Sequence, residues 1–303
     1  MVELVAVIGA TGAQGKSVVK VLSEHPDKYK IRGITRNTGS ARVQELQKLY
    51  PNVEWVSADL DDIDSLHQAF QGVDIVFGNT SYLEPAILQK VDAGDFDAQF
   101  RQGKNMVDAA LAQNVRHFVF SSVVSAAEIS KGKYANAYDP EGKAKIKRYI
   151  EESPISSYFV YAGFYFQNYL QAGVRIGDKV VFMYPLPPNS KQLYVDIEED
   201  LGNTVELILS DRDKYKGKSI AAGEGYYSGN EVAAAYTRAT GIGAEFRFSY
   251  IPGFDRPDIN SMFDFFAEFD GFSGVDTNEA KQHAHKPFTT LDQFWAKHSD
   301  FNP

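Results

Sequence analysis

The stretch Leu4-Val5-Ala6-Val7-Ile8-Gly9-Ala10-Thr11-Gly12-Ala13-Gln14-Gly15 decides the fold of this chain. Its first five residues form a short apolar run rich in β-branched side chains, which is typical of a buried strand. The glycines that follow have the spacing G-x-x-G-x-x-G, and apolar residues at helical spacing come next (Val18, Val19 and Leu22). The sequence therefore predicts a strand, a tight glycine turn and a helix, in that order.

Strand-like and helix-like segments alternate from this point to Tyr161. Further strands are expected at Tyr29–Thr35, Val53–Ser57, Val73–Phe77, Arg116–Phe120 and Ser157–Tyr161. The helices between them are expected at Gln14–Ser23, Ala41–Leu49, Ile63–Phe70, Phe96–Gln113 and Gly142–Glu152. Strands joined through helices are parallel, with right-handed crossovers that cover both faces of the sheet. We predict an α/β fold in which residues 1–165 form a Rossmann-type, doubly wound parallel sheet.

The alternation stops after Phe164. The run Pro185-Leu186-Pro187-Pro188 interrupts the chain, and helices near Asp200–Ser210 and Ser228–Thr240 are separated by short strand-like pieces. We expect residues 166–303 to form a smaller mixed α/β lobe that binds a substrate or a partner at the carboxyl edge of the sheet. Two strand-like pieces of this lobe, Lys218–Ala222 and Phe246–Tyr250, are expected to return to the sheet.

Composition excludes several classes of protein. The 303 residues include no cysteine, which excludes a disulfide scaffold, a thiolate metal site and a cysteine nucleophile. The net charge of −9 argues against direct binding of nucleic acid. The apolar runs are too short to cross a membrane and no secretory leader is evident, so we expect a cytoplasmic protein, also nuclear if it is a regulator. The oligomeric state is left open.

The glycine loop has the placement of a dinucleotide-binding loop. Gly9 permits the tight turn, Gly12 lets the backbone approach a pyrophosphate, and Gly15 lets the helix close on the strand. Thr11, Ala13 and Gln14 complete the loop, and the anion lies at the helix N-terminus. A glycine-rich turn without a ligand is the alternative, but the position at the first strand–helix junction favours the cofactor.

The residues after the second strand indicate which dinucleotide is bound. An NAD site places a carboxylate there for the ribose hydroxyl, whereas a positive side chain suits a 2′-phosphate. This strand ends in Thr35-Arg36-Asn37, and no Asp or Glu occurs between Asp27 and Glu45. A guanidinium pairs well with a phosphate. The sequence therefore favours NADP(H), with a solvated Arg36 as the alternative.

Polar residues also follow the third and fourth strands. Asp59 and Leu60 are expected beside the adenine, and Asn79 and Thr80 beside the pyrophosphate and the nicotinamide ribose. Residues of these types are also common in turns without any ligand. No metal site is expected, because His283 and His285 have no further ligand nearby in the sequence.

Several segments together resemble the NmrA-like family, whose members are atypical short-chain dehydrogenases/reductases, with fungal members most similar. The resemblance covers nearly the whole chain and rests on Gly9–Gly15, Thr35–Asn37, Gln102–Ala110, Ser121-Ser122, Tyr161–Asn168 and Val195–Gly202. It implies that NADP(H) binds to the glycine loop, to Arg36 with the neighbouring Asn37, and to Lys143. It also implies that the segment containing Phe164, Tyr165 and Asn168 borders the nicotinamide. Ser40 is also expected at the cofactor, at the position where some relatives carry a second basic residue.

The usual proton donor of the superfamily is missing. Ordinary members use a Tyr four residues before a Lys, but Asp139 stands four residues before Lys143, and no Tyr-x-x-x-Lys occurs in the chain. Lys143 itself is one substitute, provided that its pKa is lowered. A loop tyrosine, Tyr134 or Tyr138, is another. Ser121 or Ser122 is a candidate to hydrogen-bond a substrate carbonyl, with a satisfied strand-end serine as the alternative. Contact of Lys143 with the cofactor ribose alone and a plain surface lysine are the non-catalytic alternatives.

Two functions follow from these features. The leading hypothesis is an NADPH-dependent reductase of a small carbonyl or conjugated, aromatic substrate. The alternative is a redox sensor that binds NADP(H) without catalysis and regulates a protein partner such as a transcription factor. The acidic run Asp196–Asp200 is expected to be a solvated helix start, which in a sensor would face a basic partner.

Overall fold

Seven parallel strands form the central sheet of the computed structural model, which describes residues 2–250 and 256–303. Their order across the sheet is β11-β6-β5-β4-β1-β2-β3, and every neighbouring pair is parallel. The strands are β1 (Glu3–Ile8), β2 (Tyr29–Thr35), β3 (Glu54–Ser57), β4 (Ile75–Gly78), β5 (His117–Ser122), β6 (Ser156–Ala162) and β11 (Ser219–Ala222). The predicted α/β class with a Rossmann-type sheet is confirmed.

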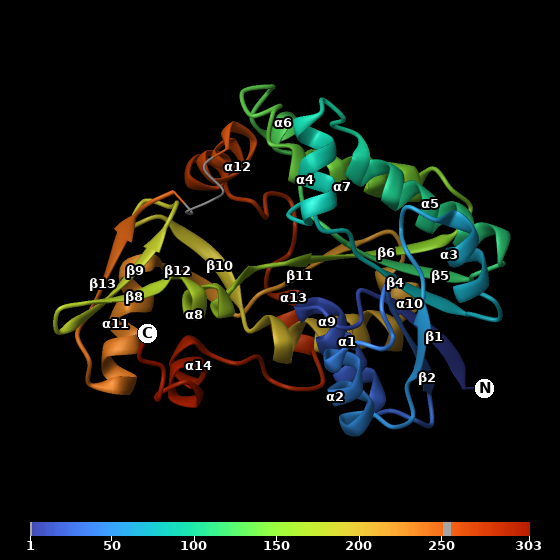
Figure 1. Cartoon of the computed structure of the whole chain (residues 1–303), viewed down its shortest axis with the longest axis horizontal. Helices are drawn as coiled ribbons and strands as arrows, with labels where there is room; N and C mark the ends of the chain where they lie inside the picture. The colour runs from blue at the N-terminus through green and yellow to red at the C-terminus, as the bar shows by residue number, and fades with distance from the viewer. Residues whose placement is uncertain (1, 251–255) are drawn as a thin grey trace.

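Helices cover both faces of this sheet (Figure 1). One face carries α1 (Ala13–Ser23), α2 (Ala41–Leu49) and α9 (Ile197–Ser210). The other carries α3 (Ile63–Ala69), α4 (Pro85–Asp92), α5 (Ala98–Ala112), α6 (Ala126–Ile129) and α7 (Tyr138–Glu151). The short helix α10 (Arg212–Tyr215) leads into β11.

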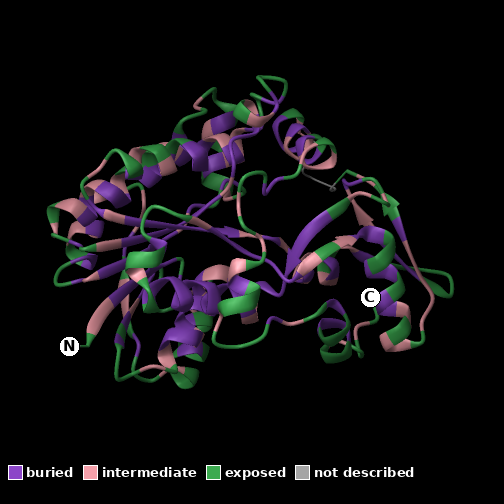
Figure 2. Ribbon diagram, turned by 180° about the vertical axis from the view of Figure 1, so that it is seen from behind, coloured by how far each residue is buried: buried purple, intermediate pink, exposed green. Residues whose placement is uncertain are grey.

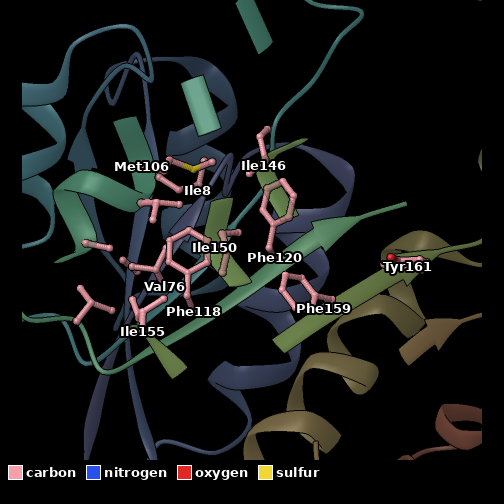
Figure 3. Packing of buried hydrophobic residues seen from close by; sticks show 14 of the residues in the cluster. Ile8, Val76, Met106, Phe118, Phe120, Ile146, Ile150, Ile155, Phe159 and Tyr161 are labelled. Atoms are coloured by element: carbon pink, nitrogen blue, oxygen red, sulfur yellow. The ribbon is translucent and has the colours of Figure 1, made fainter. Parts of the chain in front are cut away.

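The alternation of side chains along each strand builds two cores, one on each face. In β1, Ala6 and Ile8 belong to the core under α5 and α7, whereas Val5 and Val7 belong to the core under α1 and α9. Figure 3 shows the first of these cores, in which Phe118 and Phe120 of β5 lie among side chains of the helices above them. Buried residues accordingly run along the length of the central strands (Figure 2). This two-sided burial explains why the strands read as apolar runs.

The second half of the chain adds two small sheets. The first contains β7 (Phe164–Tyr165), β10 (Lys191–Val195) and β12 (Gly225–Ser228), and the second contains β8 (Gly173–Ile176), β9 (Lys179–Tyr184) and β13 (Ala244–Phe248). The helical segments here are η1 (Phe166–Asn168), α8 (Tyr169–Ala172), α11 (Gly229–Thr240), α12 (Pro257–Glu268), α13 (Glu279–His283) and α14 (Leu291–Lys297). Aromatic side chains fill the core between them, with Phe182, Tyr236 and Trp295 fully buried.

The two strands expected to return to the central sheet behave differently. Lys218–Ala222 does so, as β11, which pairs with β6. The expectation for Phe246–Tyr250 is wrong, because β13 pairs in parallel with β9. The reason is local packing, because the ring of Phe246 lies close to Gly229 at the start of α11. A Cβ on Gly229 would lie 2.4 Å from the Phe246 ring. This contact and the aromatic core keep the strand within the lobe.

The start of α7 also differs from the prediction. The helix begins at Tyr138 rather than at Gly142, because Asp139, Pro140 and Glu141 fit a first helical turn. Tyr138 is therefore a helical residue and not a loop residue. Its ring stacks on Phe96 with the ring centres 4.5 Å apart.

Candidate functional site

A cavity of about 330 Å³ lies where the carboxyl ends of β1, β2, β3 and β4 meet the start of α1. Most of the predicted cofactor residues line it, namely Gly9, Thr11, Gly12, Ala13, Gln14, Gly15, Arg36, Asp59, Leu60, Asn79, Thr80 and Tyr165. All of them except Tyr165, which belongs to β7 of a small sheet, come from four strand ends that are far apart in the sequence. The parallel sheet brings these ends to one edge, as expected for an open α/β sheet.

The backbone of the glycine loop has little room for side chains. Gly9 has a φ of +64°, in the left-handed region that favours glycine. Its carbonyl accepts a hydrogen bond from the N–H of Gly12 at 2.9 Å. A Cβ on Gly15 would lie 2.3 Å from the Gly9 oxygen and 2.8 Å from the Ala10 Cα, both backbone atoms. The helix therefore closes directly on the strand end, which is the role predicted for Gly15.

The N-terminus of α1 faces the cavity. Gly12 is the N-cap residue and no side chain caps the helix. The first-turn residues Ala13, Gln14 and Gly15 line the cavity. Backbone N–H groups and the positive end of the helix dipole are the groups that hold a pyrophosphate in Rossmann folds. The loop and the helix terminus therefore fit the diphosphate bridge of a dinucleotide.

Arg36 lines the cavity next to an acidic partner that the sequence did not indicate. Its Nη2 lies 3.0 Å from Oε2 of Glu84, the residue before α4, which also lines the cavity. The Arg36 side chain is 61% exposed and that of Glu84 is 38% exposed, so both can move. At the end of β3, Asp59 accepts a hydrogen bond from the N–H of Asp61 at 2.9 Å, which fixes its carboxylate beside the cavity.

Asn37 and Ser40 do not line the cavity. The Asn37 side chain accepts a hydrogen bond from the N–H of Gly39 at 2.9 Å, which forms a local turn. Ser40 is the N-cap of α2 and accepts from the N–H of Val43 at 3.3 Å. Both side chains are thus used by the backbone that follows β2. Their contact with a cofactor stays a prediction.

Lys143 lies behind the cavity wall, at the ends of β4 and β5. Its ammonium donates to Oδ1 of Asn79 at 3.1 Å, to the carbonyl of Thr80 at 2.8 Å and to the carbonyl of Ser121 at 3.4 Å. The residue is 8% exposed, and burial lowers its pKa, while the charge of Asp139 opposes this effect. Lys143 therefore holds two residues of the cavity wall in place.

Asp139 occupies the position of the usual catalytic tyrosine. It accepts a hydrogen bond from Nε2 of Gln99 at 2.9 Å, and the same nitrogen lies 3.3 Å from Oγ1 of Thr80. Gln99 and Thr80 are both buried. Asp139 thus takes part in a hydrogen-bond network behind the wall and leaves no hydroxyl donor at that position.

The segment that the resemblance places at the nicotinamide contributes one side chain to the cavity. Tyr165 accepts a hydrogen bond from Nε2 of Gln14 at 2.6 Å, and burial raises its pKa to about 12. Phe164 packs edge-on against Phe266 with the ring centres 5.1 Å apart. Asn168 donates to the hydroxyl of Tyr184 at 3.1 Å. Phe164 and Asn168 therefore make contacts away from the cavity and do not line it.

The remaining catalytic candidates are also located. Ser121 is buried at the end of β5, with its carbonyl bonded to Lys143. The hydroxyl of Tyr134 donates to Glu268 at 2.6 Å and so points toward the lobe helix α12. Tyr138 packs in an apolar cluster with Tyr82 and other residues around α4. Neither tyrosine lines the cavity.

Several residues of the cavity were missed by the sequence analysis, chiefly Ser81, Glu84 and Gln102. Glu84 follows β4 by six positions and Gln102 lies inside α5, so neither sits at the start of a loop after a strand. A second cavity of about 530 Å³ runs along β11 and contains none of the predicted site residues.

Two features are absent from the described residues. In residues 2–250 and 256–303, no group of three or more His, Asp or Glu side chains is placed to hold a metal ion. Within the same residues, every helix is too short or too polar to span a bilayer.

Comparison with known proteins gives a consistent family. The family model described as the NmrA-like family matches residues 1–295. An NmrA-like family domain-containing protein of Dictyostelium discoideum is 26% identical, covering 98% of both chains. An NmrA-like family domain-containing oxidoreductase of Penicillium ochrochloron is 28% identical, covering 89% of this chain and 85% of its own.

Solved structures agree in fold. The negative transcriptional regulator NmrA in complex with NADP has a TM-score of 0.79 at 22% identity, covering 98% of this chain and 95% of its own. Its complex with NAD has a TM-score of 0.80 at 23% identity, with the same coverage. An NADPH-dependent quinone oxidoreductase of Escherichia coli, complexed with NADPH, has a TM-score of 0.72 at 20% identity, covering 97% and 99%. Because the family model spans nearly all of its 303 residues, this chain belongs to the NmrA-like family.

Proposed function

We propose that this protein is an NADPH-dependent reductase that acts on a small carbonyl or conjugated, aromatic substrate. The observation that carries the proposal is the cavity in which the uncapped start of α1, the glycine loop and Arg36 meet. Relatives named as oxidoreductases and neighbours crystallised with NAD, NADP and NADPH support it.

The donor groups of the cavity define how the cofactor would lie. The start of α1 would hold the pyrophosphate and Arg36 the 2′-phosphate, with Asp59 and Leu60 beside the adenine. Asn79 and Thr80, which are held in place by Lys143, would contact the nicotinamide ribose. Tyr165 would border the nicotinamide.

The bound cofactor would supply a hydride to the substrate carbon, and the chain must supply a proton to the oxygen. Lys143 is the candidate donor, because burial lowers the pKa of its ammonium and so favours release of the proton. Lys143 does not itself line the cavity but contacts Asn79 and Thr80, which do. Tyr138 is a weaker candidate, since it stacks on Phe96.

The test measures binding and turnover separately. NADPH is titrated into the purified protein by calorimetry, and its oxidation is followed by absorbance with a panel of quinones, aldehydes, ketones and enones. We expect turnover that Lys143→Met abolishes, while NADPH still binds but more weakly, because Lys143 also positions Asn79 and Thr80 of the cavity wall. The matched control is Lys145→Met in the same helix, because Lys145 is exposed and pairs with Asp97. Turnover that survives in Lys143→Met refutes its role as donor, and absence of NADPH binding refutes the proposal.

A second candidate function is a redox sensor that binds NADP(H) and regulates a protein partner such as a transcription factor. The observation in its favour is that Lys143 is enclosed by three protein oxygens and that Asp139 replaces the usual tyrosine. The sensor is supported if no compound of the substrate panel oxidises NADPH and if the protein binds a captured partner with different affinity in the presence of NADPH and of NADP⁺. Equal partner affinity with both nucleotides refutes it.

A further inference from the structure

Arg36 and Glu84 form an ion pair in the lining of the cavity. Nη2 of Arg36 lies 3.0 Å from Oε2 of Glu84, and both residues line the cavity. A carboxylate oxygen at this distance from the guanidinium occupies one of the positions from which a phosphate oxygen would bind. Glu84 therefore competes directly for the group that the proposed function assigns to the 2′-phosphate.

The backbone holds Glu84 in this place. It is the N-cap residue of α4 and adopts an extended conformation with φ −61° and ψ 131°, and Pro85 follows as the first helical residue. Its carbonyl accepts from the N–H groups of Ile87 and Leu88 at 2.9 and 3.0 Å. Its carboxylate makes no capping hydrogen bond to its own helix. The carboxylate is thus directed to Arg36 instead of being used by α4.

Resting on the proposed function, we infer that Glu84 sets the selectivity of this site between NADP(H) and NAD(H). A 2′-phosphate that binds Arg36 must displace the Glu84 carboxylate and then lie near it, and two anions near one guanidinium repel each other. NAD(H) brings no such phosphate, so the ion pair is kept. The carboxylate is then available to accept a hydrogen bond from a ribose hydroxyl, a task that Rossmann folds usually give to an acid after the second strand.

This chain has no acid at that usual position, because Asp and Glu are absent between Asp27 and Glu45. Glu84 comes from the far side of the cavity, after β4, and brings a carboxylate to the same guanidinium. The site therefore combines an arginine that suits NADP(H) with a carboxylate that suits NAD(H).

The test compares NADPH and NADH binding by calorimetry for wild type, Glu84→Gln and Glu45→Gln. Glu84→Gln keeps the size and polarity of the side chain and removes its charge. We expect it to tighten NADPH about threefold to tenfold, which is about 0.6–1.4 kcal/mol, without tightening NADH. The gain should shrink as salt is raised, because screening weakens the repulsion. Glu45→Gln is the control, since Glu45 pairs with Arg42 at 3.4 Å and does not line the cavity.

The outcomes separate the inference from the proposed function. If wild type binds the nucleotides and Glu84→Gln leaves the NADPH to NADH ratio unchanged, the role of Glu84 is refuted and the proposed function stands. A change of equal size for both nucleotides also refutes it. If wild type binds neither nucleotide, both fail. Glu84→Ala, which removes the carboxylate in a second way, must shift the ratio in the same direction.

Discussion

Replacing Arg36 with Ala tests the assignment of the 2′-phosphate site most directly. The side chain and its partner Glu84 are 61% and 38% exposed, and an exposed ion pair contributes about 0–1 kcal/mol to stability. The fold should therefore tolerate the change. A hydrogen bond between charged groups contributes about 1.5–3 kcal/mol to binding. We expect Arg36→Ala to weaken NADPH by that amount, which is roughly tenfold to 150-fold.

The effect on NADH should be different in kind. NADH has no 2′-phosphate, so its affinity should change by less than about 0.5 kcal/mol, the size usual for a surface substitution. Calorimetric titration of both nucleotides at one fixed ionic strength gives the comparison, and urea unfolding of each variant checks that stability is retained. Arg42→Ala is the matched control, because Arg42 is exposed, lies six positions later and pairs with Glu45.

Two results would contradict the assignment of Arg36 to the 2′-phosphate. Equal weakening of NADPH and NADH would mean that Arg36 supports the cavity as a whole and does not read the phosphate. An unchanged NADPH affinity would mean that the guanidinium stays with Glu84 when the nucleotide binds. In either case the preference for NADP(H) would have to come from another residue.

Three further variants test other parts of the structure. In Gly15→Ala the new Cβ would lie 2.3 Å from the Gly9 oxygen, so we expect a lower melting temperature and loss of NADPH binding. The control Gly39→Ala, whose new Cβ would have its nearest contact at 3.4 Å, should change neither. Equal melting temperatures for the two variants would contradict this expectation. Tyr165→Phe removes the hydrogen bond between Tyr165 and Gln14, so the free energy of unfolding measured in urea should fall by about 0.5–1.5 kcal/mol, and NADPH should bind more weakly. An unchanged unfolding curve would show that this hydrogen bond does not contribute to stability. Burial raises the pKa of Asp200 from 3.8 to about 8, so the folded state keeps a proton that the unfolded chain releases and stability falls as the pH rises from about 4 to about 8. Asp200→Asn should therefore gain about 1–3 kcal/mol near pH 8.5 and little near pH 4, and a gain that is the same at both values would rule out this explanation.

The sheet and the inner cofactor loop were predictable because their signals are local. The strand β2 (Tyr29–Thr35) and the helix α2 (Ala41–Leu49) begin and end where the pattern predicts. The loop Gly9–Gly15 lines the cavity because a strand, a glycine turn and a helix in succession leave one geometry for the backbone. Arg36, Asp59 and Asn79 follow from the same rule, since each stands just after a parallel strand.

Contacts between distant segments were not predictable. Glu84 reaches Arg36 across 48 positions, and Gln14 reaches Tyr165 across 151. Neither partner belongs to a spacing pattern, so only the folded chain shows the pairs. The length of α7 was misjudged for a related reason, because the hydrophobic pattern does not include the polar first turn.

The acidic run Asp196–Asp200 shows how burial can reverse an interpretation. The prediction of a helix start is confirmed, since Asp196 is the N-cap of α9 and accepts from the N–H of Glu199. The prediction of a solvated run is wrong for two of its members, because Asp196 and Asp200 are 0% and 1% exposed. Asp200 accepts a hydrogen bond from the N–H of Thr289 at 3.0 Å, so a distant segment covers it. This run is therefore a poor surface for a basic partner.

Lys143 is the residue at which the two proposed functions separate. Its ammonium serves three oxygens at the ends of β4 and β5, and these would lose a charged donor if the proton left. Catalysis through Lys143 therefore requires that the proton be replaced in each turnover, and the lowered pKa makes its release easier but does not supply the replacement. A sensor would need no such cycle, because Lys143 would keep its proton and only position Asn79 and Thr80 for the proposed cofactor. The same three hydrogen bonds thus support cofactor binding under both proposals, and only turnover distinguishes them.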